Sequence, residues 1–471
     1  MQYPACLLRY GLLTVALVWF AGYSALAAQD VSAVAGKRLY SQSVPGLSAD
    51  QRLDFMVGRG IFRRLWVTAP ASTQAADGLG PLYNARSCAA CHPDNGRGRA
   101  MQADDAGGTG LVLRIDVPAQ DAVDRQRLAT HRINNVSEPS YGVQLQDAAI
   151  PGHRAEHRLA VDFEESTVTL GDGETVTLRR PRYRVEDLGY GPLHAQARLS
   201  PRLAPQLIGL GLIEAIRERD ILAREDPDDA DGDGISGRAN RVWHEATGQV
   251  MLGRFGHKAG MPDVDQQVQS AFATDLGLSV PLYPAATGDC SGRQADCMSA
   301  PNGNSPQYDD LEAHRTVTDL VGSYVSHLAV PARRAIDMPD VIAGERLFST
   351  IGCQACHTPA YRTGDQTASP ATHHRDIAPY TDLLLHDMGE GLADDRPEGI
   401  ADGREWRTAP LWGIGLTSAV SGDTGFLHDG RARSLLEAIL WHGGEAQTQR
   451  DAVVALDRRS REQLLAFIRS L

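Results

Sequence analysis

Two short cysteine motifs carry the clearest chemistry in this chain. Each has two cysteines three positions apart and a histidine directly after the second: Cys88, Cys91 and His92, and Cys353, Cys356 and His357. On a helical turn these three positions share one face. Cys-x-x-Cys-His is the attachment signature of haem c, in which the thiols bond the porphyrin and the histidine binds the iron. The sequence therefore predicts two covalently attached haem groups.

Other uses of paired cysteines fit less well. A zinc site needs four ligands from close pairs, whereas these motifs lie more than two hundred residues apart. A thioredoxin-like pair sits in a βαβ unit and needs no following histidine. A third pair, Cys290 and Cys297, lies in a loop rich in glycine, aspartate and serine, and we expect a disulfide there; free redox-active thiols are the alternative.

Helices on either side of the second motif are expected to position it. Asp340 can cap a helix that carries Gly344 and Phe348 just before the motif, and Ser460 begins a capping box for an amphipathic helix at the end of the chain. Such a pair of helices clamps a small cytochrome fold. We therefore expect residues 336–471 to form a C-terminal cytochrome c domain that holds haem 2.

A long insert separates the two motifs. Residues 157–168 and 175–180 are rich in β-forming side chains and flank a turn at residues 171–173, which predicts a β-hairpin whose second strand ends at Pro181. We expect residues 28–335 to form the N-terminal haem-1 domain that carries this insert. The predicted fold class is mainly α, with two cytochrome c-like haem domains.

His442 is a candidate ligand for the second haem iron. Ser434 and Glu437 form a capping box that starts a helix, and Gly443-Gly444 stops it directly after His442. An imidazole held at that helix end can bind iron. Alternatively it only complements the helix dipole.

The N-terminus predicts export. Arg9 precedes an apolar run over residues 11–28, and small residues at Ala25 and Ala27 form a cleavage site. We expect residues 1–27 to be a signal peptide, which places the mature chain in the periplasm without a membrane span. The alternative is an uncleaved anchor, because the run approaches a membrane-spanning length. The net charge of -13 argues against nucleic acid as a partner.

Six segments spread over nearly the whole mature chain form a specific combination: GPLYNARSC (80–88), GLGLIEA (209–215), GRFGHKA (253–259), RTAPLWG (407–413), LHDGRA (427–432) and WHGGEA (441–446). In that order they resemble the bacterial di-haem oxidoreductase family, sometimes labelled thiol oxidoreductases. This family is related to the di-haem cytochrome c peroxidases and to MauG.

The resemblance implies that electrons enter at the C-terminal haem. In the peroxidases the helix after the His-Asp-Gly motif supplies a methionine ligand just before a glycine, and MauG uses a tyrosine. His442 holds that place here, which implies that His357 and His442 both bind the iron of haem 2. This departs from the peroxidase pattern and implies a low-potential centre.

At haem 1, His92 is the expected proximal ligand. Peroxide chemistry needs an open sixth position and a nearby acid–base group. Glu214, an acid in an apolar run, is our candidate, since burial would raise its pKa; an arginine-paired glutamate is the alternative. His257 stands where the family more often has tryptophan and is either a distal group or packing. Trp412 is either an electron bridge or core packing.

An aspartate-rich loop predicts a calcium ion. Oxygen ligands stand at alternate positions with Gly234 at the sixth, as in the first half of an EF-hand loop, although the twelfth position is Asn240. A solvated acidic loop is the alternative. The expected ligands are Asp229, Asp231, Asp233 and the backbone of Ile235.

Together these patterns predict a periplasmic di-haem c-type oxidoreductase that reduces hydrogen peroxide at haem 1. Its expected partners are a small redox donor protein, either a cytochrome or a cupredoxin, and a small-molecule oxidant such as peroxide. Two alternatives remain: an electron-transfer cytochrome without substrate chemistry, and a MauG-like oxidant of a protein or thiol substrate.

Overall fold

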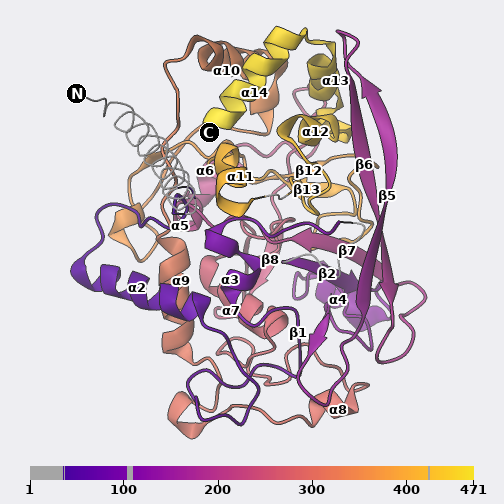
Figure 1. Ribbon diagram of the computed structural model, residues 1–471, viewed down its shortest axis with the longest axis vertical. Coiled ribbons are helices and arrows are strands. Elements are labelled where there is room, and N and C mark those ends of the chain that lie inside the picture. Colours follow the sequence, from indigo (N-terminus) through magenta and orange to yellow (C-terminus); the bar gives the residue numbers. More distant parts are fainter. Residues whose placement is uncertain (1–35, 37, 103–109, 423–424) are drawn as a thin grey trace, which may run out of the picture.

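Two pairs of crossing helices organise the molecule. The computed structural model describes residue 36 and residues 38–102, 110–422 and 425–471, so the expected signal peptide lies outside the described residues. Near the N-terminus, α2 (Ala49–Arg63) packs on α9 (Arg315–Ser326). At the other end of the molecule, α10 (Pro339–Ile351) packs on α14 (Arg458–Ser470) (Figure 1). We call α2, the first haem motif and α9 the first unit, and α10, the second motif and α14 the second unit.

The two units repeat the same packing. In each, a glycine lies where the two helices cross, and a Cβ atom there would clash with a backbone carbonyl oxygen of the partner helix. A phenylalanine four residues later contacts the motif histidine, with ring centroids 6.4 Å apart in the first unit and 6.2 Å apart in the second. The residues are Gly58, Phe62 and His92, and Gly344, Phe348 and His357. The chain therefore contains a structural repeat around its two motifs.

The crossing glycines should be sensitive to a single added methyl group. We expect Gly58→Ala to lower the free energy of unfolding by about 1–3 kcal/mol, because the new Cβ would meet the carbonyl of Leu320 and force the helices apart. Gly60→Ala on the same helix is the matched control. Nothing lies within 4 Å of a Cβ there, so it should stabilise the helix by up to about 1 kcal/mol. Urea unfolding of the holoprotein measures both, and equal effects would contradict this packing.

The expectation of a mainly α fold is wrong. The structure is 31% helical and 19% strand, with several small sheets. The physical reason is the insert, whose alternating and β-branched segments pair into hairpins and one three-stranded sheet of order β3-β2-β7. Most strands belong to this insert: β2 (Leu111–Asp116), β3 (Gln144–Leu145), β4 (Ala148–Ala149), β5 (Arg158–Thr169), β6 (Thr175–Glu186), β7 (Arg198–Leu203), β8 (Arg241–His244) and β9 (Gln249–Leu252). The others are β1 (Leu82–Tyr83), β10 (Tyr361–Arg362), β11 (Asp376–Ile377), β12 (Leu385–Asp387) and β13 (Glu405–Arg407).

The predicted β-hairpin is present and longer than expected. Strands β5 and β6 are antiparallel, and Figure 1 shows them running along one side of the molecule towards α13. The expected end of β6 at Pro181 is wrong, because the strand passes through Pro181, which pairs with Phe163. In a two-stranded ribbon each strand has a free edge, so a proline without an N–H is tolerated on that side.

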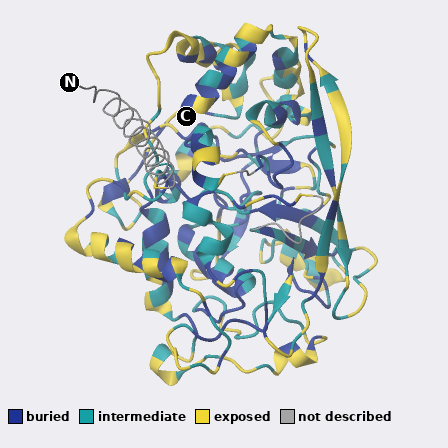
Figure 2. Ribbon diagram, in the orientation of Figure 1, coloured by how far each residue is buried: buried dark blue, intermediate teal, exposed yellow. Residues whose placement is uncertain are grey.

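The largest buried core draws on both halves of the chain. It extends from Tyr40 to Val420, whereas a smaller core between α10 and α14 extends from Val341 to Leu471. Figure 2 shows these buried segments inside the molecule. The proposed boundary between residues 335 and 336 falls just before α10 and stays a prediction. The remaining helices are α3 (Cys88–Cys91), α4 (Ala122–Ala129), α5 (Leu210–Glu214), α6 (Glu218–Leu222), α7 (Val264–Asp275), α8 (Ala295–Met298), α11 (Thr417–Ser421), α12 (Leu435–Leu440) and α13 (Gln447–Ala455). Within the described ranges, no helix has the length and apolar character needed to cross a membrane.

Candidate functional site

A single cavity joins the two cysteine motifs. Its volume is about 820 Å³, and its walls come from both units and from the insert. The cavity is mostly apolar, as a site for a large planar cofactor must be. The residues of both motifs line it together with the candidate sixth ligand: Cys88, Cys91, His92, Cys353, Cys356, His357 and His442.

The three candidate iron ligands share one hydrogen-bonding arrangement. Nδ1 of His92 lies 2.8 Å from the carbonyl oxygen of Pro205, Nδ1 of His357 lies 3.0 Å from that of Tyr380, and Nδ1 of His442 lies 2.8 Å from that of Ala438. A carbonyl oxygen only accepts, so each Nδ1 carries the proton and donates it. Each Nε2 is then unprotonated and available to a metal, which is how iron-binding histidines are usually oriented.

Burial keeps these imidazoles neutral. It lowers the pKa of His92 and of His442 below the usual range. For His357, burial together with the nearby His442 lowers the pKa to about 4. Neutral imidazole is the form that binds a metal. Both His357 and His442 line the cavity.

A further spacing recurs outside the two units. His428 lines the cavity, the N-cap Ser434 of α12 follows six positions later, and His442 stands eight positions after that cap, just beyond the end of α12. Earlier in the chain, His257 lines the cavity and the N-cap Asp263 of α7 also follows six positions later.

The residue eight positions after Asp263 is Ala271, which also lines the cavity. Alanine has no atom that can bind iron. The two matching positions therefore differ: the one after the cap of α12 carries an imidazole and the one after the cap of α7 carries a methyl group, and both side chains line the cavity.

Two half-buried arginines in the cavity wall indicate that the cavity accepts anionic groups. Arg97 donates to the carbonyl oxygens of Gly425 and Leu427 at 3.0 and 2.6 Å, and Arg407 donates to that of Gly256 at 2.9 Å. Both line the cavity, and neither forms an ion pair with a carboxylate among the described residues. Burial lowers the pKa of each to about 10. A buried guanidinium without a counter-ion is costly, and the propionates of haem would supply one.

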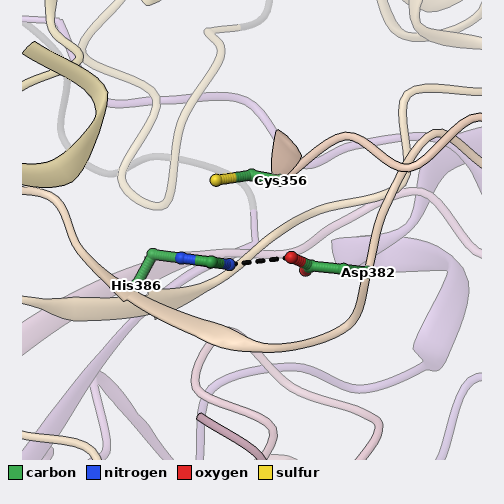
Figure 3. Close-up of side chains that lie close together, drawn as sticks. All are labelled: Cys356, Asp382 and His386. Carbon is green, nitrogen blue, oxygen red and sulfur yellow. Dashed lines mark hydrogen bonds and ion pairs between the residues drawn. The ribbon is translucent and has the colours of Figure 1, made fainter. Parts of the chain in front are cut away.

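A charged network lies beside the second motif. His386 is 2.8 Å from a carboxylate oxygen of Asp382 and 2.8 Å from one of Glu445, and Ser236 donates to Glu445 at 2.7 Å. Figure 3 shows His386 and Asp382 pointing towards each other below the sulfur of Cys356. Burial alone would lower the pKa of His386, but these carboxylates raise it well above the usual range. This network places a protonated imidazole next to the second motif.

Two further sequence candidates also line the cavity. His257 is enclosed there, and burial holds its pKa well below the usual range. Trp412 is 4% exposed and lines the same cavity. His428 stacks on Trp406 with ring centroids 3.8 Å apart, and its buried Nε2 has no hydrogen-bond partner in the part of the chain that the structure describes.

Glu214 does not line the cavity. One of its carboxylate oxygens accepts the backbone N–H of Val264 at 2.9 Å, at the N-terminus of α7. Burial raises its pKa. A carboxylate in the first turn of a helix satisfies a free backbone N–H and complements the helix dipole. The structure therefore places Glu214 at the N-terminus of α7, next to the cavity-lining Val264 but outside the cavity wall.

The aspartate-rich loop brings together part of the predicted ligand set. Carboxylate oxygens of Asp226, Asp229 and Asp231 lie within 4.8 Å of one another. Asp233 instead accepts the backbone N–H of Ile235 at 2.9 Å. Asp226 was not expected from the loop spacing, because it precedes the EF-hand-like segment. Elsewhere, Cys290 and Cys297 form a disulfide.

The two motifs, the neutral imidazoles and the apolar cavity that joins them fit a haem-binding protein. The chain belongs to the di-haem oxidoreductase family: the family described as "Di-haem oxidoreductase, putative peroxidase" matches residues 30–471, which confirms the resemblance and a general oxidoreductase role. No curated protein matches the chain. A solved structure of hydrazine synthase from Kuenenia stuttgartiensis under xenon is similar, with 14% identity over 54% of this chain and 88% of that chain and a TM-score of 0.24. That similarity is too weak to carry an argument.

Proposed function

We propose that this chain is an exported di-haem c-type oxidoreductase that takes electrons from a small redox protein at the second haem site and reduces hydrogen peroxide at the first. The observation that carries this proposal is the contrast between His442 and Ala271. The second motif has a further cavity-lining imidazole, His442, which would suit a haem used for electron transfer. The position with the same spacing near the first motif carries only the methyl group of Ala271, which would leave room for a small oxidant beside the haem that His92 binds.

The chain's own residues hold and orient the cofactor. When bound, haem supplies the iron that exchanges electrons and reacts with the oxidant. The four motif cysteines would attach the two groups, and the carbonyl-bound imidazoles of His92, His357 and His442 have Nε2 free to bind iron. Arg97 and Arg407 in the cavity wall would offset the negative charge of the propionates. The apolar walls exclude water, which strengthens every charge interaction in the cavity.

Export to the periplasm agrees with the cysteine chemistry. A disulfide between Cys290 and Cys297 persists in an oxidising compartment. The expected signal peptide over residues 1–27 supplies the route. The acidic chain, with a net charge of -13, suits a basic donor, and we propose a small cytochrome or cupredoxin in that role.

We also propose calcium at the aspartate cluster. Asp231→Asn should weaken calcium binding at least about tenfold, because a carboxylate charge is lost from an oxygen-ligand site. Isothermal titration calorimetry on the chelator-treated holoprotein measures this. Asp228→Asn is the matched control, since Asp228 is exposed, lies in the same loop and is outside the cluster. Equal binding by wild type and both variants would contradict the site, as would no binding by any of them.

Steady-state turnover tests the proposed function. Holoprotein supplied with a reduced small cytochrome and hydrogen peroxide should oxidise the donor, and the reaction should stop when peroxide is consumed. Donor oxidation that is independent of peroxide would favour an electron carrier. Peroxide consumption that oxidises an added protein or thiol, without turnover of the cytochrome, would favour MauG-like chemistry.

A further inference from the structure

The β5–β6 hairpin connects the surroundings of both haem motifs. At its base, Val161 packs in a buried cluster with Ala100 and Leu203. Leu203 lies two residues before Pro205, whose carbonyl orients His92. This end of the hairpin therefore rests on the segment that positions the first motif histidine.

The tip of the hairpin is fixed to the second unit. The backbone N–H of Gly171 donates to the carbonyl oxygen of Val454 at 2.7 Å. Arg461 on α14 is 1% exposed and binds both carboxylates of the turn, Asp172 at 2.9 Å and Glu174 at 2.6 Å. A buried guanidinium held by two carboxylates is a specific contact, because removing both partner charges leaves the arginine uncompensated.

The hairpin also packs against α12, the helix that ends just before His442. Leu170 and Leu178 are 3% and 4% exposed, and they share a buried core with Leu440 and Trp441. The guanidinium of Arg180 also lies 5.8 Å from the ring centroid of Trp441. Trp441 directly precedes His442 in the chain, so the hairpin supports the imidazole through its immediate neighbour.

Arg433 links strand β6 to α12. It donates to the carbonyl oxygen of Thr177 on β6 at 2.6 Å and pairs with Glu437 on α12 at 2.9 Å. α12 is only 6 residues long, which is too short to be stable on its own. Its position therefore depends on packing against other elements, and the hairpin is one of them.

We propose that the β5–β6 hairpin is a brace that holds His442 at the second haem site, with Leu178 and Arg461 as positioning residues. The inference rests on the proposed function, because it takes His442 as an iron ligand. It goes further in assigning control of that ligand to an element of the first haem region. Substitutions that weaken these hairpin contacts make His442 easier to displace from the second haem iron and leave His92 and the first haem site unchanged.

Two variants at separate ends of the brace test this. Leu178→Ala removes the core contact with Trp441, and the double variant Asp172→Asn/Glu174→Gln removes the charges that hold Arg461. Glu164→Gln is the matched control, since it neutralises an exposed carboxylate of the same hairpin whose ion pair among the described residues is with Arg182. The double variant changes only the turn, so it keeps the test valid if Leu178→Ala fails to fold.

The readout is carbon monoxide binding to the dithionite-reduced holoprotein, with low-temperature EPR of the oxidised form. Wild type and Glu164→Gln should bind carbon monoxide at the first haem and keep a low-spin second haem. The brace variants should bind it at the second haem at least about tenfold faster than wild type. Variants that match wild type would overturn the brace. A wild-type second haem that is not low-spin would instead overturn the proposed ligand pair.

Discussion

Replacing Ala271 with histidine should stop the protein from reacting with peroxide. Ala271 and His442 each stand eight positions after a helix N-cap, and both line the cavity. We expect an imidazole at position 271 to bind the first haem iron, as we propose for His442 at the second. A strong sixth ligand must leave before an oxidant can bind, so we expect the second-order rate constant with peroxide to fall on the order of 100-fold or more, which corresponds to about 2.7 kcal/mol.

Stopped-flow spectroscopy of the holoprotein measures that rate constant. Ala271→Val is the matched control, because it adds bulk at the same position without a nitrogen ligand. It should slow the reaction far less than histidine and leave the first haem high-spin. If histidine and valine slow the reaction equally, the effect is steric and the proposed correspondence between α7 and α12 is wrong.

Replacing His442 with methionine should raise the reduction potential of one haem and leave the other unchanged. A thioether stabilises ferrous iron relative to an imidazole. Axial ligands set haem potentials over a span of about 0.8 V, and we expect a rise on the order of 0.1 V or more from this change. Because His442 lies at the second motif, only the lower-potential haem should move.

A spectroelectrochemical titration that resolves the two haems measures this shift. His327→Met is the matched control. His327 is also buried, but it bonds to Ser323 and Ser369 and does not line the cavity. If both potentials stay where they are in His442→Met, His442 is not an iron ligand and its position at the end of α12 serves packing only.

Features confined to one short segment were predictable from the sequence. The haem motifs are contiguous, so the spacing of their cysteines and histidine specifies their chemistry without knowledge of the fold. The helix start before His442 was predictable for a similar reason, since Ser434 caps α12 through the backbone N–H of Glu437 as its spacing indicated, and the role of His442 as an iron ligand stays a prediction. The disulfide pair was also local, because only seven positions separate its two cysteines.

Features that depend on distant segments were not predictable. The fold class was wrong because the strands of the insert are short and pair with partners that no local pattern identifies. Glu214 looked like an acid in an apolar run, but its partner is a backbone N–H of α7 some fifty residues later. His386 and Glu445 meet from separate segments. Ala271 belongs to no sequence motif. Its correspondence with His442 follows only from comparing the positions after the N-caps of α7 and α12, which the structure defines.

Low-temperature EPR of the oxidised and half-reduced holoprotein, before and after addition of hydrogen peroxide, tests the central claim most directly. We expect a low-spin second haem with two histidine ligands and a high-spin first haem whose signal disappears when peroxide is added. Two low-spin signals in every state, unchanged by peroxide, would contradict an open first site and leave electron transfer without substrate chemistry as the better description.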